Sequence, residues 1–231
     1  MPTGQEHTVK AFDADIGQIR GLISQMGGLA EEALADAMTA LSRGDARLAK
    51  QVRAKDKAID AIEHEVEKLA VRVIALRAPM ADDLREVVAA LKIAAVIERI
   101  GDYAKNIAKR VDAIHTGPDR IEAISILPAM ANLASDMVRD VLDAFARRDA
   151  AAAIEVHRRD QALDDFYNSI FRVLLTFMAE NPKTISEVAH LLFVAKNIER
   201  IGDHATNVAE MVYFAATGRY MADIETAGDP L

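Results

Sequence analysis

A chain of 231 residues with 36 acidic and 28 basic side chains has a formal charge of −8, which argues against a phosphate-binding surface for DNA or RNA. The absence of cysteine excludes disulfides, thiolate zinc sites and a cysteine nucleophile, and it suits a reducing cytoplasm. Aromatic residues make up only 5% of the chain, and β-branched residues rarely alternate with polar ones, so long helices are favoured over sheets.

No apolar run in the sequence approaches the roughly 18–20 residues that a membrane-spanning helix needs. The N-terminal segment 1–20 also lacks the apolar centre of a signal peptide. The chain is therefore predicted to be soluble, with any membrane contact made through a partner.

Residues that end or begin helices divide the chain into long helical segments. Gly44 and Asp45 end one helix and cap the next, Pro79 lies early in a third, and the break at 115–119 contains Gly, Pro and a capping acid. Helices of about 30 residues extend about 45 Å, a length typical of up-down bundles with short loops. The predicted helices span 5–43, 45–77, 80–115, 120–147, 149–180 and 182–216.

The two halves of the chain repeat each other. Segment 98–108, Glu-Arg-Ile-Gly-Asp-Tyr-Ala-Lys-Asn-Ile-Ala, matches 199–209, Glu-Arg-Ile-Gly-Asp-His-Ala-Thr-Asn-Val-Ala. The capping acids Asp45 and Asp149 also correspond. This duplication predicts an all-α fold of two tandem three-helix bundles. The predicted units are residues 1–117 and 118–218, followed by a frayed tail at 219–231.

Acidic residues recur at helical spacing in these repeats. Positions four apart lie about 40° apart around a helix, so residues at i, i+4 and i+8 share one face. The third and sixth predicted helices carry a Glu, an Asp and an Asn in one stripe, and the second and fifth carry a pair of Asp residues. The candidate ligands are Glu98, Asp102, Asp56 and Asp60 in the first repeat, Glu199, Asp203, Asp160 and Asp164 in the second, and, more weakly, Asn106 and Asn207.

Several carboxylates converging from neighbouring helices need counter-charge, which a multivalent cation supplies directly. Oxygen ligands without cysteine suit Mg²⁺, Ca²⁺, Mn²⁺ or iron better than a structural Zn²⁺.

Gly101 and Gly202 lie in the middle of the acidic stripes. Because glycine inside a helix costs about 1 kcal/mol relative to alanine, its presence indicates close approach of a neighbouring helix.

A plainer interpretation of the same acids stays open. A single Glu-x-x-x-Asp pair is usually a solvated helix face, and Asp56 and Asp60 lie beside Lys55 and Lys57, with which they could form surface ion pairs. The identity of the two repeated segments at eight positions, in repeats that have diverged elsewhere, favours a metal site.

The histidines support neither a catalytic nor a ferritin-like site. Glu187 and His190 imitate half of a di-iron motif, but the first repeat lacks this histidine. His190 also lies about 180° round the helix from Glu199. His204 is at most a tuning residue, since its counterpart is Tyr103. No catalytic triad, phosphate loop or dinucleotide fingerprint is readable, so no enzymatic activity is predicted.

Two tandem three-helix units, each ending in Glu-Arg-Ile-Gly-Asp-x-x-x-Asn and each with Asp-x-x-x-Asp on its middle helix, resemble the PhoU family over residues 6–218. The resemblance implies a cytoplasmic accessory protein of the phosphate-specific transport system that restrains phosphate uptake and negatively regulates the phosphate-starvation response. It implies two partners, the ATPase subunit of the phosphate ABC transporter and the sensor histidine kinase of the phosphate regulon, and it implies a homodimer. Family members carry iron, zinc, manganese or magnesium on these acidic motifs.

Applied to this chain, the resemblance implies one metal site in each repeat, made from the four carboxylates of that repeat. The neighbouring residues differ, with Tyr103 and Lys105 in the first repeat against His204 and Thr206 in the second. The two sites therefore need not hold equal numbers or kinds of metal. Two other functions stay open: a carboxylate-cluster metalloenzyme and a metal-free helical scaffold.

Overall fold

The structure, a computed structural model, describes residues 4–114 and 125–226, with side chains from 11–114 and 125–223. In these ranges every element is helical, and none of the helices is both long and apolar enough to span a membrane. The α-helices are α1 (Gly4–Arg43), α2 (Ala46–Arg77), α3 (Asp82–Ala108), α4 (Leu127–Arg147), α5 (Ala150–Arg158), α6 (Asp160–Glu180), α7 (Ile185–Thr217) and α8 (Met221–Thr226). Short 3₁₀ turns follow α3 (η1, Val111–Ala113) and precede α7 (η3, Pro182–Thr184).

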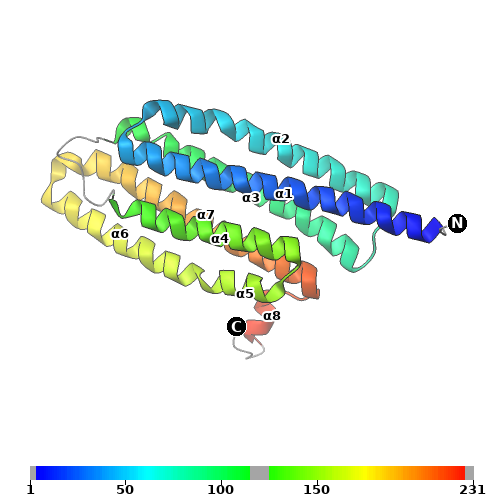
Figure 1. The fold of residues 1–231 in the computed structure, drawn as a ribbon. Helices are drawn as coiled ribbons and strands as arrows, with labels where there is room; N and C mark the ends of the chain where they lie inside the picture. The colour runs from blue at the N-terminus through cyan, green and yellow to red at the C-terminus, as the bar shows by residue number, and fades with distance from the viewer. Residues whose placement is uncertain (1–3, 115–124, 227–231) are drawn as a thin grey trace.

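The long helices form two three-helix bundles that lie side by side (Figure 1). Helices α1, α2 and α3 make the first bundle, and α4, α5 with α6, and α7 make the second. The bundles join along two seams, where α3 packs against α7 and α1 packs against α4. The predicted all-α duplicated architecture is confirmed.

The turns between the first two helices of each bundle are built alike. Gly44 and Arg148 both adopt a left-handed conformation, with φ of 65° and 54°. The side chain of Asp45 then accepts a hydrogen bond from the Leu48 amide at 2.9 Å, and Asp149 accepts one from Ala152 at 3.0 Å. Each Asp satisfies an amide that the first turn of a helix leaves unpaired, so both predicted N-caps are confirmed.

The central helices α3 and α7 bury apolar residues at steps of three and four, which follows the period of the α-helix. Both helices are covered by their own bundle and by each other, so their buried stripes are wide. Fully or almost fully buried residues on these two helices are Ile93, Ile97, Ile100, Ile107, Val194, Ile198, Ile201 and Val208. The acidic stripes therefore project from helices whose positions the core holds rigidly.

Several predicted boundaries are wrong. The third helix ends at Ala108 instead of 115, and the fourth begins at 127 instead of 120; the predicted break at 115–119 lies outside the described residues. Within the tail predicted to fray at 219–231, residues 221–226 instead form α8, where Met221 is buried against the bundle and Tyr220 stacks on Phe214 with ring centroids 4.8 Å apart; residues 227–231 lie outside the described residues.

The predicted fifth helix is broken into α5 and α6, whereas its counterpart α2 is continuous. At the break, the Arg159 amide bonds to the carbonyl of Val156 at 3.1 Å, three residues back instead of four. This tighter turn changes the direction of the helix immediately before Asp160. Neither Gly nor Pro occurs there, so local sequence contains no signal for the break.

Candidate metal centre

Glycines bring the acidic helices together. A Cβ added to Gly101 on α3 would lie 2.7 Å from Ile59 Cδ1 and 3.7 Å from Asp56 Oδ1 on α2. The equivalent atom on Gly202 would clash with Leu163 Cδ2 and lie 3.5 Å from Asp160 Oδ1. The prediction of a close helix approach at both glycines is confirmed. Each glycine lets one Asp of the neighbouring helix reach the acidic stripe.

Gly202→Ala is expected to destabilise the protein by about 1–3 kcal/mol, because Leu163 is fully buried and has no room to withdraw. The gain in helix propensity, about 1 kcal/mol, offsets only part of this strain. Urea denaturation measures the difference. The matched control is Gly28→Ala on α1, where no atom lies within 4 Å of the added Cβ. A Gly202 variant as stable as this control would contradict the close approach.

In the second bundle, three carboxylates converge from two helices. Asp164 on α6 and Glu199 and Asp203 on α7 each offer an oxygen, and these oxygens all lie within 4.8 Å of one another. Two nearby oxygens, Asp160 Oδ1 and Glu199 Oε2, are buried without a hydrogen-bond partner among the described residues. Three of the four predicted ligands of this repeat therefore converge, and the fourth, Asp160, lies near enough for their charges to raise its pKa.

Burial and like charge make this cluster costly when it is ionised. Burial, together with the charges of Asp164, Asp203 and Glu199, raises the pKa of Asp160 to about 6, with His157 opposing the shift. Burial also raises the pKa of Glu199 and of Asp203, with Lys196 partly opposing both shifts. A bound cation would remove this cost and satisfy the orphaned oxygens. The donor set, oxygen atoms alone, fits a hard divalent cation such as Mg²⁺ or Mn²⁺.

Asp160→Asn is expected to stabilise the metal-free protein at pH 7.5 by about 1 kcal/mol. Folding raises the pKa of Asp160 from 3.8 to about 6, so the folded protein binds more protons in this interval and loses stability as the pH rises through it. The full shift corresponds to about 3 kcal/mol, which partial exposure reduces to about 1.

Denaturation with chelator at pH 4.5 and at pH 7.5 tests this expectation. The variant gains stability over the wild type at the higher pH and little at the lower one. Asp165→Asn changes an exposed neighbouring carboxylate and is expected to change stability by less than about 0.5 kcal/mol at both pH values. An equal gain for both variants would rule out the special environment of Asp160.

In the first bundle, two of the four equivalent acids form ion pairs with a lysine. Lys105 donates from Nζ to Asp56 Oδ2 at 2.5 Å and to Asp102 Oδ1 at 2.9 Å. Burial raises the pKa of Glu98, and Asp102, Glu63, Asp60 and Asp56 raise it in turn. The four predicted ligands are thus neighbours here too. In the described part of this bundle, however, no three carboxylates come within the 4.8 Å seen in the second.

Glu63 is a fifth acid beside the acidic residues of the first bundle, here called the first groove, and the sequence analysis did not identify it. It lies seven residues after Asp56, about two turns along α2, and that spacing is the signal that could have identified it. Its own pKa is raised by burial and by Glu67 and Asp60, with His64 opposing. The equivalent residue of the second bundle is Tyr167, so this acid belongs to the first groove alone.

The weaker candidates, the two asparagines, make contacts along their own helices. Asn106 Oδ1 accepts from Lys109 at 2.9 Å, and Asn207 Nδ2 donates to His204 Nδ1 at 3.3 Å. The other ring nitrogen of His204 lies 3.1 Å from the hydroxyl of Tyr103. These contacts direct both amides away from the carboxylate cluster.

Tyr103 and His204 occupy equivalent positions and stack on each other across the seam between the bundles, with ring centroids 5.3 Å apart. Burial lowers the pKa of His204, and Arg99 and Arg200 lower it further, so the ring is neutral at pH 7. In the sequence, Tyr103 and His204 are simply different residues at equivalent positions of the two repeats. The available signal that the two rings meet was their equivalent position on α3 and α7, which pack against each other.

His190 lies away from the acidic cluster and accepts a hydrogen bond from Arg110 at 3.3 Å.

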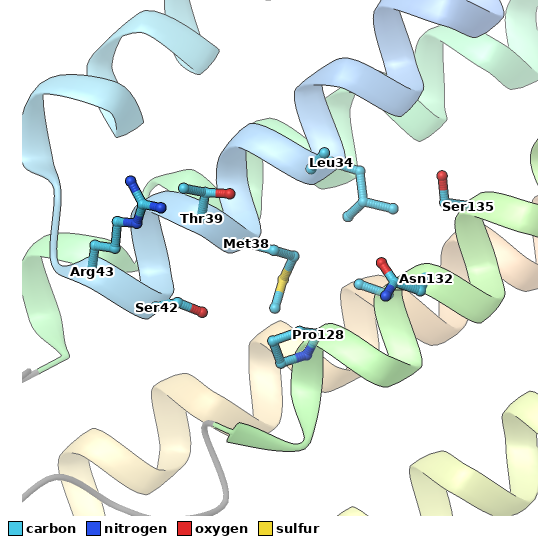
Figure 2. A pocket seen from close by; sticks show the side chains of 10 residues that line it. Leu34, Met38, Thr39, Ser42, Arg43, Pro128, Asn132 and Ser135 are labelled. Atoms are coloured by element: carbon cyan, nitrogen blue, oxygen red, sulfur yellow. The ribbon is translucent and has the colours of Figure 1, made fainter.

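A separate pocket of about 330 Å³ lies between α1 and α4 (Figure 2). Leu34 and Met38 face Pro128 and Asn132 across it, and its lining contains no carboxylate. This pocket is therefore unsuited to a cation.

Comparison with known proteins agrees with this architecture. The model of the PhoU domain matches residues 23–111 and 127–212, one copy in each bundle. The "Phosphate-specific transport system accessory protein PhoU homolog" of Zymomonas mobilis subsp. mobilis is 54% identical over 217 residues, covering 94% of this chain and 91% of that protein. The homolog of the same name from Caulobacter vibrioides is 48% identical over 214 residues, covering 92% and 93%.

Solved structures show the same fold. PhoU from Pseudomonas aeruginosa superposes with a TM-score of 0.85 at 36% identity, covering 90% of this chain and 100% of that one. The phosphate transport system regulatory protein PhoU from Streptococcus pneumoniae superposes with a TM-score of 0.84 at 26% identity, covering 91% and 99%. With the duplicated domain, the fold and the relatives in agreement, this chain belongs to the PhoU family.

Proposed function

We propose that this protein is a cytoplasmic, metal-binding and non-enzymatic adaptor of a phosphate transport system. In this role it restrains phosphate uptake and the phosphate-starvation response by linking the transporter ATPase to a sensor histidine kinase. The names of its relatives, an accessory protein of phosphate-specific transport and a phosphate transport regulator, support the regulatory part. They also favour an adaptor over the alternative of a carboxylate-cluster metalloenzyme.

The observation that carries the metal-binding part is the convergence of Asp164, Glu199 and Asp203 beside two orphaned oxygens. A metal-free scaffold would leave this cluster of partly buried carboxylates only partly compensated at neutral pH, through the ion pair of Lys196 with Glu199. Asp160 and these three residues would hold the ion, and the bound cation would supply positive charge to an otherwise acidic protein. That charge would attract phosphate or an acidic partner surface.

Alanine at Glu98, Asp102, Glu199 and Asp203 together tests the proposal. We expect this variant to lose its metal, measured by elemental analysis, and to lose repression of the phosphate-starvation response and capture of the transporter ATPase. A control variant carries the same charge change at four exposed acids: Glu65, Asp112, Asp143 and Glu180. Undiminished metal content in the first variant would refute the assignment, and intact repression without metal would restrict the metal to a structural role.

The proposal includes a homodimer, which the family resemblance implies. Sedimentation equilibrium of the purified chain measures this directly. A monomer at micromolar concentration would remove dimerisation from the proposal and leave the adaptor role in place.

A further inference from the structure

We propose that the ammonium group of Lys105 occupies the cation position of the first bundle, so that the second bundle is the high-affinity metal site. This inference rests on the metal-binding role proposed above. The two repeats would then have diverged. The acidic residues of the first would be neutralised by Lys105, and those of the second would bind a metal ion.

The contacts of Lys105 place its charge between the two acidic helices. Its Nζ reaches Asp56 Oδ2 on α2 at 2.5 Å and Asp102 Oδ1 on α3 at 2.9 Å. Asp56 is only 6% exposed, so the partner that neutralises it cannot be replaced by bulk water. A divalent ion would have to displace this group to reach the same oxygens.

Among the residues that the structure describes, no side-chain cation in the second bundle takes the place that Lys105 has in the first. Thr206 takes the position of Lys105, and its hydroxyl donates to the backbone carbonyl of Asp203 at 2.7 Å, away from the cluster. The side chain of Glu199 is nine-tenths buried, and its Oε2 has no partner among the described residues, as is also true of Asp160 Oδ1. Unpaired acceptors on both helices therefore face a position that no side-chain cation bridges.

Lys196 is the one lysine that contacts this second cluster in the described ranges, and its geometry differs from that of Lys105. It pairs with Glu199 Oε1 from the preceding turn of the same helix, and its ammonium lies 5.2 Å from the ring centroid of Tyr167. Its side chain is 40% exposed, so it lies at the rim of the groove. Its ion-pair partner is a carboxylate of its own helix, so it does not bridge the carboxylates of α6 and α7 as Lys105 bridges those of α2 and α3.

Displacing an ammonium that makes two charge-assisted hydrogen bonds is expected to weaken divalent binding in the first bundle by about ten- to a hundredfold relative to the second. The substitution Lys105→Thr makes the first groove like the second, and Thr206→Lys makes the second like the first. Lys105→Gln removes the charge while keeping a side chain of similar length. It serves as an independent variant if Lys105→Thr does not fold, which circular dichroism reports.

The experiment titrates Mn²⁺ into chelator-treated full-length protein at pH 7.5 by calorimetry, with elemental analysis after desalting. We expect high-affinity Mn²⁺ content to double in Lys105→Thr and Lys105→Gln and to be lost in Thr206→Lys. The matched control is Lys109→Thr, which removes the lysine at the C-cap of α3, four residues after Lys105, and leaves the content at the wild-type value. Neutralising Glu199 and Asp203 is expected to remove all high-affinity binding from the wild type and only half of it from Lys105→Thr.

Two results would overturn this inference. If neutralising Glu199 and Asp203 removes only half of the wild-type Mn²⁺, the two bundles bind the ion equally. If both Lys105 variants bind no more Mn²⁺ than the wild type, Lys105 is not what keeps the ion out of the first bundle. The proposed metal-binding function would survive either result. If the wild type and every Lys105 variant bind no Mn²⁺, both the inference and the proposed metal-binding role fail.

Discussion

Replacing Glu199 with Gln and Asp203 with Asn is expected to lower the affinity of the second bundle for Mn²⁺ by at least about a hundredfold while stabilising the metal-free protein. Loss of groups that merely orient a metal ligand costs ten- to a hundredfold, so losing two ligands costs at least as much. The pKa of both carboxyls is raised by burial, which means that their charges oppose folding at neutral pH. Removing those charges is therefore expected to raise the stability of the metal-free protein.

Calorimetric titration measures the affinity, and thermal denaturation with and without chelator measures the stability. A control variant carries Asp165→Asn and Glu210→Gln on the same helices, where Asp165 accepts from Gln161 and Glu210 lies 3.8 Å from His157. We expect this control to bind Mn²⁺ like the wild type. A double variant that is destabilised without metal would contradict an uncompensated cluster, because it would show that protein partners already hold these carboxylates.

Glu86→Ala is expected to destabilise the protein by about 2–3 kcal/mol. Glu86 on α3 is 4% exposed, accepts from Arg20 Nε on α1 at 2.7 Å, and lies 3.4 Å from Arg148 in the turn between α4 and α5. It therefore ties both bundles together through one buried carboxylate. Truncating one partner of a buried ion pair leaves the other charges uncompensated, and the partial exposure of both arginines keeps the loss below the usual 3–5 kcal/mol.

Urea denaturation measures this loss, and the dependence of the free energy of unfolding on urea concentration is expected to stay unchanged. Glu65→Ala removes an exposed acid from α2 and is expected to stay within about 0.5 kcal/mol of the wild type. Glu86→Gln keeps an acceptor without the charge and should fall between the two. If Glu86→Ala matched the Glu65 control, the contacts with both arginines would contribute nothing to stability.

Features that depend on neighbours along the chain could be predicted from the amino-acid sequence. Helical periodicity, together with the repeat of segment 98–108 at 199–209, determined the all-α duplicated fold. The left-handed turn followed by an Asp cap was readable because a cap satisfies amides only two or three residues away. The close helix approach at Gly101 and Gly202 was readable because glycine alone lacks the Cβ that would prevent it.

Which charged side chains contact each other across helices depends on how the helices pack in the tertiary structure. Lys105 and Thr206 differ visibly in the sequence, but the reach of the lysine to Asp56 depends on the spacing of α2 and α3. The stacking of Tyr103 on His204 depends in the same way on how the two bundles pack. Helical spacing specifies the direction of a side chain around its own axis, whereas contacts between helices depend on distances that packing alone determines. The acidic stripes were thus predictable, and the difference between the two grooves was not.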